Sequence, residues 1–439
     1  MWTYHPELLA TPVPRYTSFP TAAEFGEMGA RDMEEALAGV APDAAMSLYL
    51  HIPYCHEICW YCGCNTGAAN RAARIGAYLQ RLSEEVELVA RRLGGRGRIG
   101  RIAFGGGSPN ALEPAQFALL LAQVRRAFAC PEASVSVELD PRHFAPAWDD
   151  VFATVGIARA SLGVQTFAPA LQAAIGRIQP RALIADVTAR LRASGVRSIN
   201  YDLMYGLPAQ DVSMLIETID TALDMAPDRL AVFGYAHVPH LIPRQRRIDT
   251  AALPGPEARF RQAEAAQLRL LDDGWQAIGF DHFARPADEL AVAERRGRLR
   301  RNFQGFTDDP ADVLIGVGVS AISSFSGALL QNEKNAGRYH LRIANGQFAA
   351  ARGIRRDALD RRRGVAIEQL LCRGSADLAG LPDLAGVRAR LRPFAAERLI
   401  GWSGTRVTLM PEALPYARAI AATIDPYRQQ SATRFSSAV

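Results

Sequence analysis

A recurring pattern between residues 47 and 235 constrains the fold most strongly. Six short, apolar, β-prone runs each end in a polar or glycine-rich turn, and amphipathic helical stretches separate successive runs. Strands that are joined through helices lie parallel, with right-handed crossovers. Because a complete (β/α)8 barrel needs eight such units, the pattern predicts an α/β fold with a partial, TIM-like (β/α)6 barrel. The predicted strands span residues 47–52, 101–104, 134–139, 158–164, 197–203 and 229–235.

Polar residues and glycines gather at or just after the carboxyl ends of these strands, which is where barrel enzymes place their chemistry. Glycines let backbone approach a ligand closely. Carboxylates accept hydrogen bonds from ammonium or hydroxyl groups, and amide and guanidinium groups donate them. Taken singly, each of these residues would more often be an ordinary polar residue of a barrel rim. The residues concerned are Gly106, Gly107, Ser108, Glu138, Gln165, Arg177 and Asp202.

Four of the six cysteines lie within residues 49–65, which read YLHIPYCHEICWYCGCN. Cys55, Cys59 and Cys62 form a C-x3-C-x2-C pattern directly after the first predicted strand, and Cys64 follows two residues later. Three thiolates on one short loop can hold three irons of a 4Fe-4S cube and leave the fourth iron without a protein ligand. The loop therefore predicts an iron–sulfur cluster with an open iron, where chemistry can take place.

Three other roles for these cysteines fit the sequence less well. A structural zinc site usually has two separated C-x2-C pairs, and no second pair is present. Disulfides are disfavoured because residues 55–64 are too crowded for two pairings and the N-terminus lacks a signal-peptide pattern. Ordinary core cysteines would not cluster beside His51, His56 and Asn65.

Length and composition fit a large barrel with accessory parts. With 439 residues, of which 49% are hydrophobic, the chain can bury a sizeable core. We predict an N-terminal arm at residues 1–46, the barrel and its extension at 47–350, and a mainly helical C-terminal domain at 351–439. The sequence has no apolar run of about 18 residues, so we expect no membrane span. Despite the net charge of +5, no aromatic-basic stripe or helix-turn-helix pattern indicates nucleic-acid binding.

The cysteine loop also carries a family resemblance. C-x3-C-x2-C with an aromatic residue, Tyr61, before the last cysteine resembles the signature of the radical S-adenosylmethionine (radical SAM) superfamily. HIPYCHEICWYCGCN, with its extra Cys64, is similar to one family within it, the oxygen-independent coproporphyrinogen III oxidases. PRYTSFPTA at residues 14–22 and the phrases DHFARP, RNFQGFT and GVGVSAIS at residues 281–323 resemble that family as well. The chain departs from the family pattern at Phe19 (usually Tyr), Ser108 (usually Thr) and Gly234 (usually Asn).

The resemblance implies roles for particular residues. Cys55, Cys59 and Cys62 would ligate a 4Fe-4S cluster whose fourth iron binds SAM, and Cys64 would be functional without being a ligand. Two SAM molecules are implied. The positions that match SAM-contacting residues of the family are Tyr49, Tyr61, Gly106, Gly107, Ser108, Glu138, Gln165, Arg177 and Asp202. Those that match positions around the second SAM are Arg15, Ala236 and Ile322.

The resemblance also implies an activity in haem biosynthesis. Two propionates of coproporphyrinogen III would be oxidatively decarboxylated to vinyl groups, giving protoporphyrinogen IX. A reduced flavodoxin or ferredoxin would donate electrons, and we expect a cytoplasmic monomer because a reducing compartment suits an oxygen-sensitive cluster. Two alternatives are a related radical SAM enzyme that acts on haem and a haem-binding chaperone. The PRYTS segment favours the oxidase over both, and Cys64 argues further against the chaperone.

Overall fold

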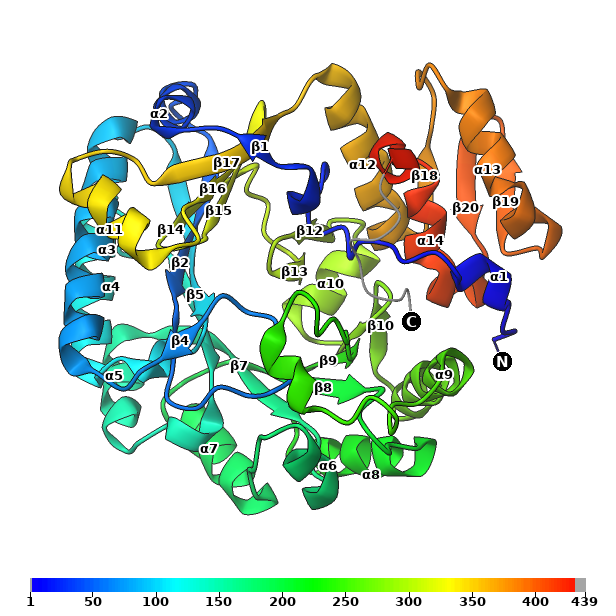
Figure 1. The fold of residues 1–439 in the computed structure, drawn as a ribbon, viewed down its shortest axis with the longest axis horizontal. Helices are drawn as coiled ribbons and strands as arrows, with labels where there is room; N and C mark the ends of the chain where they lie inside the picture. Colours follow the sequence, from blue (N-terminus) through cyan, green and yellow to red (C-terminus); the bar gives the residue numbers. More distant parts are fainter. Residues whose placement is uncertain (1, 431–439) are drawn as a thin grey trace.

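The computed structural model describes residues 2–430, and a curved parallel sheet forms its centre (Figure 1). Its six consecutive parallel strands are β2 (Ala45–Ile52), β5 (Arg98–Gly106), β6 (Ser134–Leu139), β7 (Ile157–Gln165), β8 (Ser198–Tyr205) and β9 (Arg229–Gly234). They pair in this order, each with the next. The six predicted strands and the partial-barrel fold are therefore confirmed.

Helices connect these strands and cover the outer face of the sheet (Figure 1). They are α3 (Ala72–Leu93), α4 (Pro114–Ala127), α5 (Ala147–Val155), α6 (Pro169–Ala174), α7 (Arg181–Ala193) and α8 (Val212–Leu223), and α9 (Pro256–Asp272) follows β9. In α3 the buried residues include Tyr78, Leu82, Val86 and Val89, which recur at three- and four-residue spacing and form one apolar face. The helix ends at Gly94, whose φ of +58° is left-handed.

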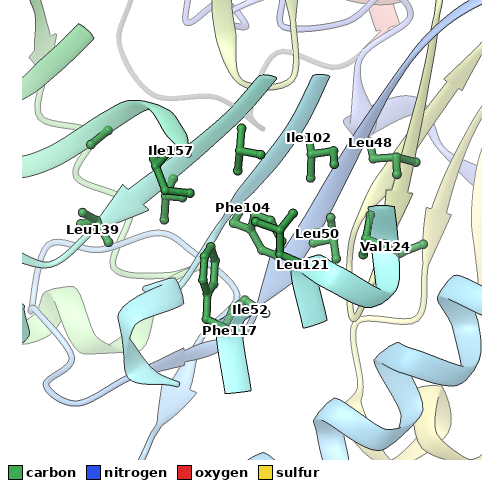
Figure 2. Close-up of a cluster of buried hydrophobic side chains, with 14 of the residues drawn as sticks. Leu48, Leu50, Ile52, Ile102, Phe104, Phe117, Leu121, Val124, Leu139 and Ile157 are labelled. Atoms are coloured by element: carbon green, nitrogen blue, oxygen red, sulfur yellow. The ribbon is translucent and has the colours of Figure 1, made fainter. Parts of the chain in front are cut away.

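Figure 2 shows part of the core between the sheet and α4. Leu48, Leu50 and Ile52 of β2 are almost completely buried, together with Phe104 of β5 and Phe117 of α4. Complete burial of one such side chain contributes roughly 1.5–3 kcal/mol. Because side chains alternate along a strand, the residues between these apolar positions on β2 point to the opposite face, toward the barrel interior.

The sheet continues beyond the six strands on both sides. β14 (Val313–Val317) pairs with β2 in parallel, a strand that the sequence analysis did not predict. Gly316 packs closely there, since a Cβ atom on it would lie 2.5 Å from the backbone oxygen of Ile322. The other strands of this side are β15 (Ile322–Phe325), β16 (Ala328–Asn332), β17 (Ala350–Arg355) and β1 (Gly26–Glu27), and β11 (His282–Ala284) and β10 (Gln276–Ile278) extend the opposite side.

Smaller elements complete the barrel region and the arm. The two-stranded pairs are β3 (Tyr54–Cys55) with β4 (Gly67–Ala68), and β12 (Arg300–Asn302) with β13 (Gly305–Thr307). The remaining helices are α1 (Pro6–Leu9), α2 (Ala30–Ala38), α10 (Glu289–Arg295) and α11 (Ala336–Ala344), and short 3-10 turns include η1 (Ala22–Glu24), η2 (Pro109–Ala111), η3 (Pro141–His143) and η4 (Pro243–Arg247). The N-terminal arm runs from the C-terminal region across to α2 on the far side (Figure 1).

The C-terminal region forms a second core, to which the arm contributes Leu9, Val13, Tyr16 and Phe19. It contains α12 (Ala358–Arg373), α13 (Leu384–Ala396), α14 (Ala417–Ala422), the turns η5 (Pro411–Tyr416) and η6 (Pro426–Gln430), and a three-stranded sheet of β18 (Ser375–Asp377), β20 (Arg406–Leu409) and β19 (Ile400–Ser403).

Because β17 crosses the predicted boundary at residue 351, we propose that this domain begins after Arg355. Residues 431–439 of the predicted domain lie outside the described part of the chain. None of the helices in residues 2–430 combines the length and apolar character needed to span a bilayer.

Candidate active site

A cavity of about 510 Å³ opens at the carboxyl ends of the parallel strands. It collects fourteen of the sixteen residues for which the sequence predicted a role in the site. These are Arg15, Cys55, Cys59, Tyr61, Cys62, Cys64, Gly106, Gly107, Ser108, Glu138, Gln165, Arg177, Asp202 and Ala236. Segments that are distant in the sequence therefore meet around one space.

Tyr49 and Ile322 are not among the residues that line this cavity. Tyr49 is half-buried on β2, and its hydroxyl lies 3.2 Å from Nδ1 of His51. Ile322 begins β15, beyond the parallel strand β14. Their predicted contacts with SAM remain predictions.

The three thiols of the C-x3-C-x2-C pattern have different surroundings. Cys55 Sγ lies 3.3 Å from the hydroxyl of Thr66, and burial raises the pKa of Cys55 to about 11. Cys62 Sγ accepts a hydrogen bond from the backbone N–H of Cys64 at 3.4 Å, and hydrogen bonding from Cys64 lowers the pKa of Cys62 to about 6. Cys64 itself is exposed on the loop that faces the cavity.

Cys59 is buried and accepts hydrogen bonds from two arginines. Arg177 Nη1 lies 3.2 Å and Arg142 Nη2 lies 3.5 Å from its sulfur. Both guanidinium groups are held by the buried carboxylate of Asp140, at 3.1 Å from Arg177 Nη2 and 2.6 Å from Arg142 Nη2. Burial opposes the charge of Asp140, but the two arginines outweigh it and lower the pKa of Asp140 to about 2. A cationic group is thereby fixed at the sulfur of Cys59.

The donor set fits a 4Fe-4S cluster. Among residues 2–430, no three His, Cys, Asp or Glu side chains are arranged to hold a single metal ion. A cube instead takes each cysteine on a separate iron, so its ligands are spread more widely. Three thiols around one cavity, with guanidinium donors at one sulfur, suit such a cluster, because hydrogen bonds to the ligating sulfurs help to tune it.

The glycines at the carboxyl end of β5, Gly106 and Gly107, are required by close packing against the protein itself. A Cβ atom on Gly107 would lie 2.4 Å from the backbone oxygen of Tyr54, and one on Gly106, whose φ is +111°, would lie 2.5 Å from the His51 ring. The buried hydroxyl of Ser108 bonds to Asn110 and accepts from a backbone N–H at 2.9 Å. These residues shape the cavity wall as well as lining it.

Within residues 2–430, two carboxylates on the wall have no arginine partner of the kind that Asp140 has. Glu138 opens onto the cavity and accepts from the backbone N–H of Gly106 at 3.3 Å. Burial of the carboxylate by the surrounding protein is the main cause that raises the pKa of Glu138 to about 7, and the nearby charge of Asp202 adds to it. Asp202, whose pKa is raised by burial, accepts from Ser161 Oγ at 3.1 Å and Asn200 Nδ2 at 2.8 Å. Such acceptors suit ammonium and hydroxyl groups, which SAM carries.

Gln165, at the end of β7, has a φ of +67°, which is rare for a residue with a side chain. A backbone held in this region is a form of strain that proteins tend to keep at functional sites. The side chain lines the cavity, where it adds a neutral donor and acceptor beside the charged groups.

The N-terminal arm reaches the same cavity through Arg15. Its Nη2 donates to the backbone oxygen of Gly234 at 3.0 Å, and its guanidinium carbon lies 5.3 Å from the centre of the Phe233 ring. The arm is held in turn by Arg301, which donates to the backbone oxygens of Arg15 and Tyr16 at 3.0 and 3.2 Å. Arg15 therefore brings the N-terminal arm to the wall of this cavity.

Comparison with known proteins gives consistent relatives. The family model described as the Radical SAM superfamily matches residues 49–222. Proteins named oxygen-independent coproporphyrinogen III oxidase from Bradyrhizobium diazoefficiens and Paracoccus denitrificans are 41% and 39% identical to this chain, each over 94% of both chains. The solved structure of coproporphyrinogen III oxidase (HemN) from Escherichia coli, described as a radical SAM enzyme, superposes with a TM-score of 0.90 at 34% identity and covers 97% of this chain and 99% of that one. This chain belongs to the oxygen-independent coproporphyrinogen III oxidase family.

Membership of the oxidase family confirms the resemblance, and the structure accounts for two departures from the family pattern. Phe19 is buried in the second core, 6.0 Å from the ring of Tyr427, so an apolar ring suits this position. At Gly234 a Cβ atom would lie 3.0 Å from the Tyr205 ring and 3.1 Å from Arg259 Nη2. A larger residue there would require these neighbours to move.

The partners that organise the cysteine loop could not be predicted from the sequence. Nothing in the sequence paired Asp140, Arg142 or Thr66 with particular cysteines. Gln245 was missed as well, although its Nε2 donates to the backbone oxygens of Tyr61 and Ala236 at 2.8 and 3.0 Å. Its signal in the sequence is one glutamine within the arginine-rich run of residues 243–247.

Proposed function

We propose that this chain is an oxidoreductase that converts two propionates of coproporphyrinogen III to vinyl groups and yields protoporphyrinogen IX without oxygen. The observation that carries the proposal is the cavity in which three thiols, the carboxylates of Glu138 and Asp202 and the arm arginine meet. The similarity to named oxidases over nearly the whole chain supports the same activity.

Each propionate would lose a hydrogen atom from its β-carbon, a molecule of carbon dioxide and one electron, and its two remaining carbons become the vinyl group. When bound, the cluster and SAM would supply a hydrogen-abstracting radical through one-electron cleavage of SAM. The hydrogen atom leaves with the adenosyl fragment, and the electron from the substrate passes to a one-electron acceptor. The protein binds and orients these groups and excludes competing reactions.

We assign the residues of the cavity to these tasks. Cys55, Cys59 and Cys62 would hold the cluster, and Arg177 and Arg142 would stabilise its negative charge at Cys59. Cys64 would act without ligating iron. Glu138, Asp202 and Gln165 would bind the ammonium and hydroxyl groups of SAM, together with Tyr49, Tyr61, Gly106, Gly107 and Ser108.

A second SAM molecule would bind where the arm meets the strand ends. Arg15 is anchored at Gly234, and Ala236 lines the same cavity. Ile322 would complete this subsite. Equilibrium dialysis with labelled SAM would then give two molecules bound per chain, and Arg15→Met would reduce that number toward one.

We further propose a cytoplasmic monomer that takes its electrons from a reduced flavodoxin or ferredoxin and binds neither nucleic acid nor membranes. The basis is chemical, because a low-potential donor and a reducing compartment are what an oxygen-sensitive cluster needs.

An anaerobic turnover assay tests the function. Reconstituted protein, SAM, dithionite and coproporphyrinogen III are mixed, and porphyrins and 5′-deoxyadenosine are measured together. We expect vinyl-bearing product with one deoxyadenosine for each vinyl group. Deoxyadenosine without decarboxylation would contradict the substrate and point to haem or another tetrapyrrole. Neither product, from protein with a full cluster, would favour a haem-binding chaperone.

A further inference from the structure

A short segment at residues 238–248 is fixed to the cysteine loop. Gln245 is buried and donates to the backbone oxygen of Tyr61 at 2.8 Å. Arg244 Nη2 donates to the backbone oxygen of Cys64 at 3.3 Å, and a Cβ atom on Gly63 would lie 3.1 Å from the side chain of Ile242. The segment therefore lies directly beside the loop that carries the thiols.

The outer side of this segment is apolar and basic. Leu241 is 61% exposed, which is unusual for a leucine side chain. Arg247 lies 5.8 Å from the centre of the Trp60 ring, and that ring packs against Gly176, where a Cβ atom would lie 2.6 Å from it. We define the loop patch as Trp60, Leu241, Arg246 and Arg247.

The patch is positively charged and open to a partner. Arg246 and Arg247 are exposed, and within residues 2–430 neither forms an ion pair with a carboxylate. Glu57 is an exposed carboxylate of the cysteine loop, but its oxygens lie 2.6 Å from Arg142 Nη1 and 3.6 Å from His143 Nε2. The positive charge of the patch is therefore not cancelled by this neighbour.

We propose that the loop patch is the docking surface for an acidic electron-transfer protein of the flavodoxin type. The inference rests on the proposed function, which requires one electron from a donor for every SAM molecule cleaved. Charge complementarity selects the occupant, since an acidic donor matches two exposed arginines around an apolar centre. Small interfaces of this kind suit electron-transfer partners that must dissociate after each transfer. The position is suitable because Trp60 lies between Cys59 and Tyr61 in the cysteine loop.

The double variant Arg246→Glu/Arg247→Glu tests the proposal, with Arg91→Glu/Arg92→Glu as its matched control. Both pairs are adjacent, exposed arginines, and both changes alter the net charge equally. We expect the affinity of reconstituted protein for an acidic flavodoxin, measured by calorimetry at low salt, to fall about tenfold or more in the patch variant. The control should change by less than about twofold, because exposed charges away from an interface act only through the long-range field.

Turnover with two reductants separates docking from chemistry. With reduced flavodoxin, the patch variant should show a KM for the flavodoxin raised about tenfold, whereas with dithionite, which needs no docking surface, its rate should equal that of the parent protein. Equal flavodoxin affinity in both double variants would overturn the proposal. A raised KM for coproporphyrinogen III with either reductant would instead assign the patch to the anionic substrate. If the parent protein forms no product with dithionite, the proposed function fails, and the calorimetric affinities still decide the docking surface.

Discussion

Glu138 and Asp140 lie on either side of Leu139 at the end of β6, yet their carboxylates have opposite electrostatic surroundings. Asp140 is enclosed between Arg142 and Arg177, and its pKa is about 2. Glu138 opens onto the cavity, and its pKa is raised to about 7 by the surrounding protein and by Asp202. The carboxylate of Asp140 holds two arginines at Cys59. The carboxylate of Glu138 faces the cavity and is available to a ligand. Charge pairing, more than residue type, separates the carboxylate that holds arginines from the carboxylate that faces the cavity.

Asp140→Asn should have the largest effect, because it removes the partner of two buried arginines. Breaking a buried ion pair on one side costs about 3–5 kcal/mol. Denaturant unfolding should show a loss of this size, and iron and sulfide analysis should show a reduced cluster content. In the parent protein this stabilisation is present above the unfolded pKa of aspartate and is lost as the pH falls toward 2, because the folded pKa is depressed.

Unchanged stability and full cluster content in Asp140→Asn would mean that the two arginines need no carboxylate between them. Asp149→Asn is a suitable control, because Asp149 is half-buried and pairs with Arg190 on the outer helices.

Glu138→Gln should weaken SAM binding while leaving the cluster in place. A charge-assisted hydrogen bond is worth roughly 1.5–3 kcal/mol, so the affinity for SAM at pH 8 should fall about tenfold or more. In the parent protein without ligand, the raised pKa of Glu138 means that stability declines as the pH rises from about 4.5 to about 7. Titration calorimetry at several pH values should show SAM affinity rising through pH 7 in the parent and flat in the variant.

The same pH dependence in both proteins would assign the titration to another group, and an unchanged SAM affinity would remove Glu138 from the binding set. Either result would weaken the contrast with Asp140.

Gly107→Ala tests whether the wall between these carboxylates and the cysteine loop is rigid. The added Cβ atom would lie 2.4 Å from the backbone oxygen of Tyr54, so the backbone must shift. Overpacking of this kind costs typically about 1–3 kcal/mol, which thermal unfolding can measure. Gly100→Ala, where no atom of the described part of the chain lies within 4 Å of the new atom, provides the control and should be close to neutral. Equal unfolding temperatures for the two variants would show that the backbone around Gly107 and Tyr54 shifts with little loss of stability.

Cys64→Ala should have the smallest effect. Because Cys64 is exposed and is not assigned as a ligand, iron content should match the parent, while turnover should fall about tenfold, a barrier change near 1.4 kcal/mol. Cys130→Ala, at a buried and isolated cysteine, should keep both values. Loss of iron in Cys64→Ala would show that the fourth thiol ligates the cluster, and full turnover would leave it without a role.

The sequence predicted the parts of this site that depend on local pattern. The six strands were recognisable from short apolar runs, and their ends positioned Glu138, Gln165 and Asp202. The pairing of Asp140 with Arg177, 37 residues away, was not predictable, because the chain has many arginines and no local rule selects one. The strand β14 was missed because its glycine- and serine-rich surroundings, from residue 314 to 323, lack clear alternation.

The arm shows the same limit. A resemblance indicated that Arg15 belongs to the site, but its anchor at Gly234 is 219 residues away and is a backbone oxygen. Every residue carries a backbone oxygen, so the residue type at position 234 does not indicate that its oxygen accepts this hydrogen bond. What the sequence conveys well is therefore which side chains lie at strand ends, and what it conveys poorly is which of them are paired.

We propose that a substrate propionate and the adenosyl group of SAM meet in the cavity between the cysteine loop and the strand ends. The most direct test uses coproporphyrinogen III deuterated at the propionate β-carbons, with mass analysis of the 5′-deoxyadenosine formed under anaerobic turnover. The account predicts one deoxyadenosine for every vinyl group produced, and each of these deoxyadenosines should carry one deuterium atom. Vinyl-bearing product accompanied by unlabelled deoxyadenosine would contradict it.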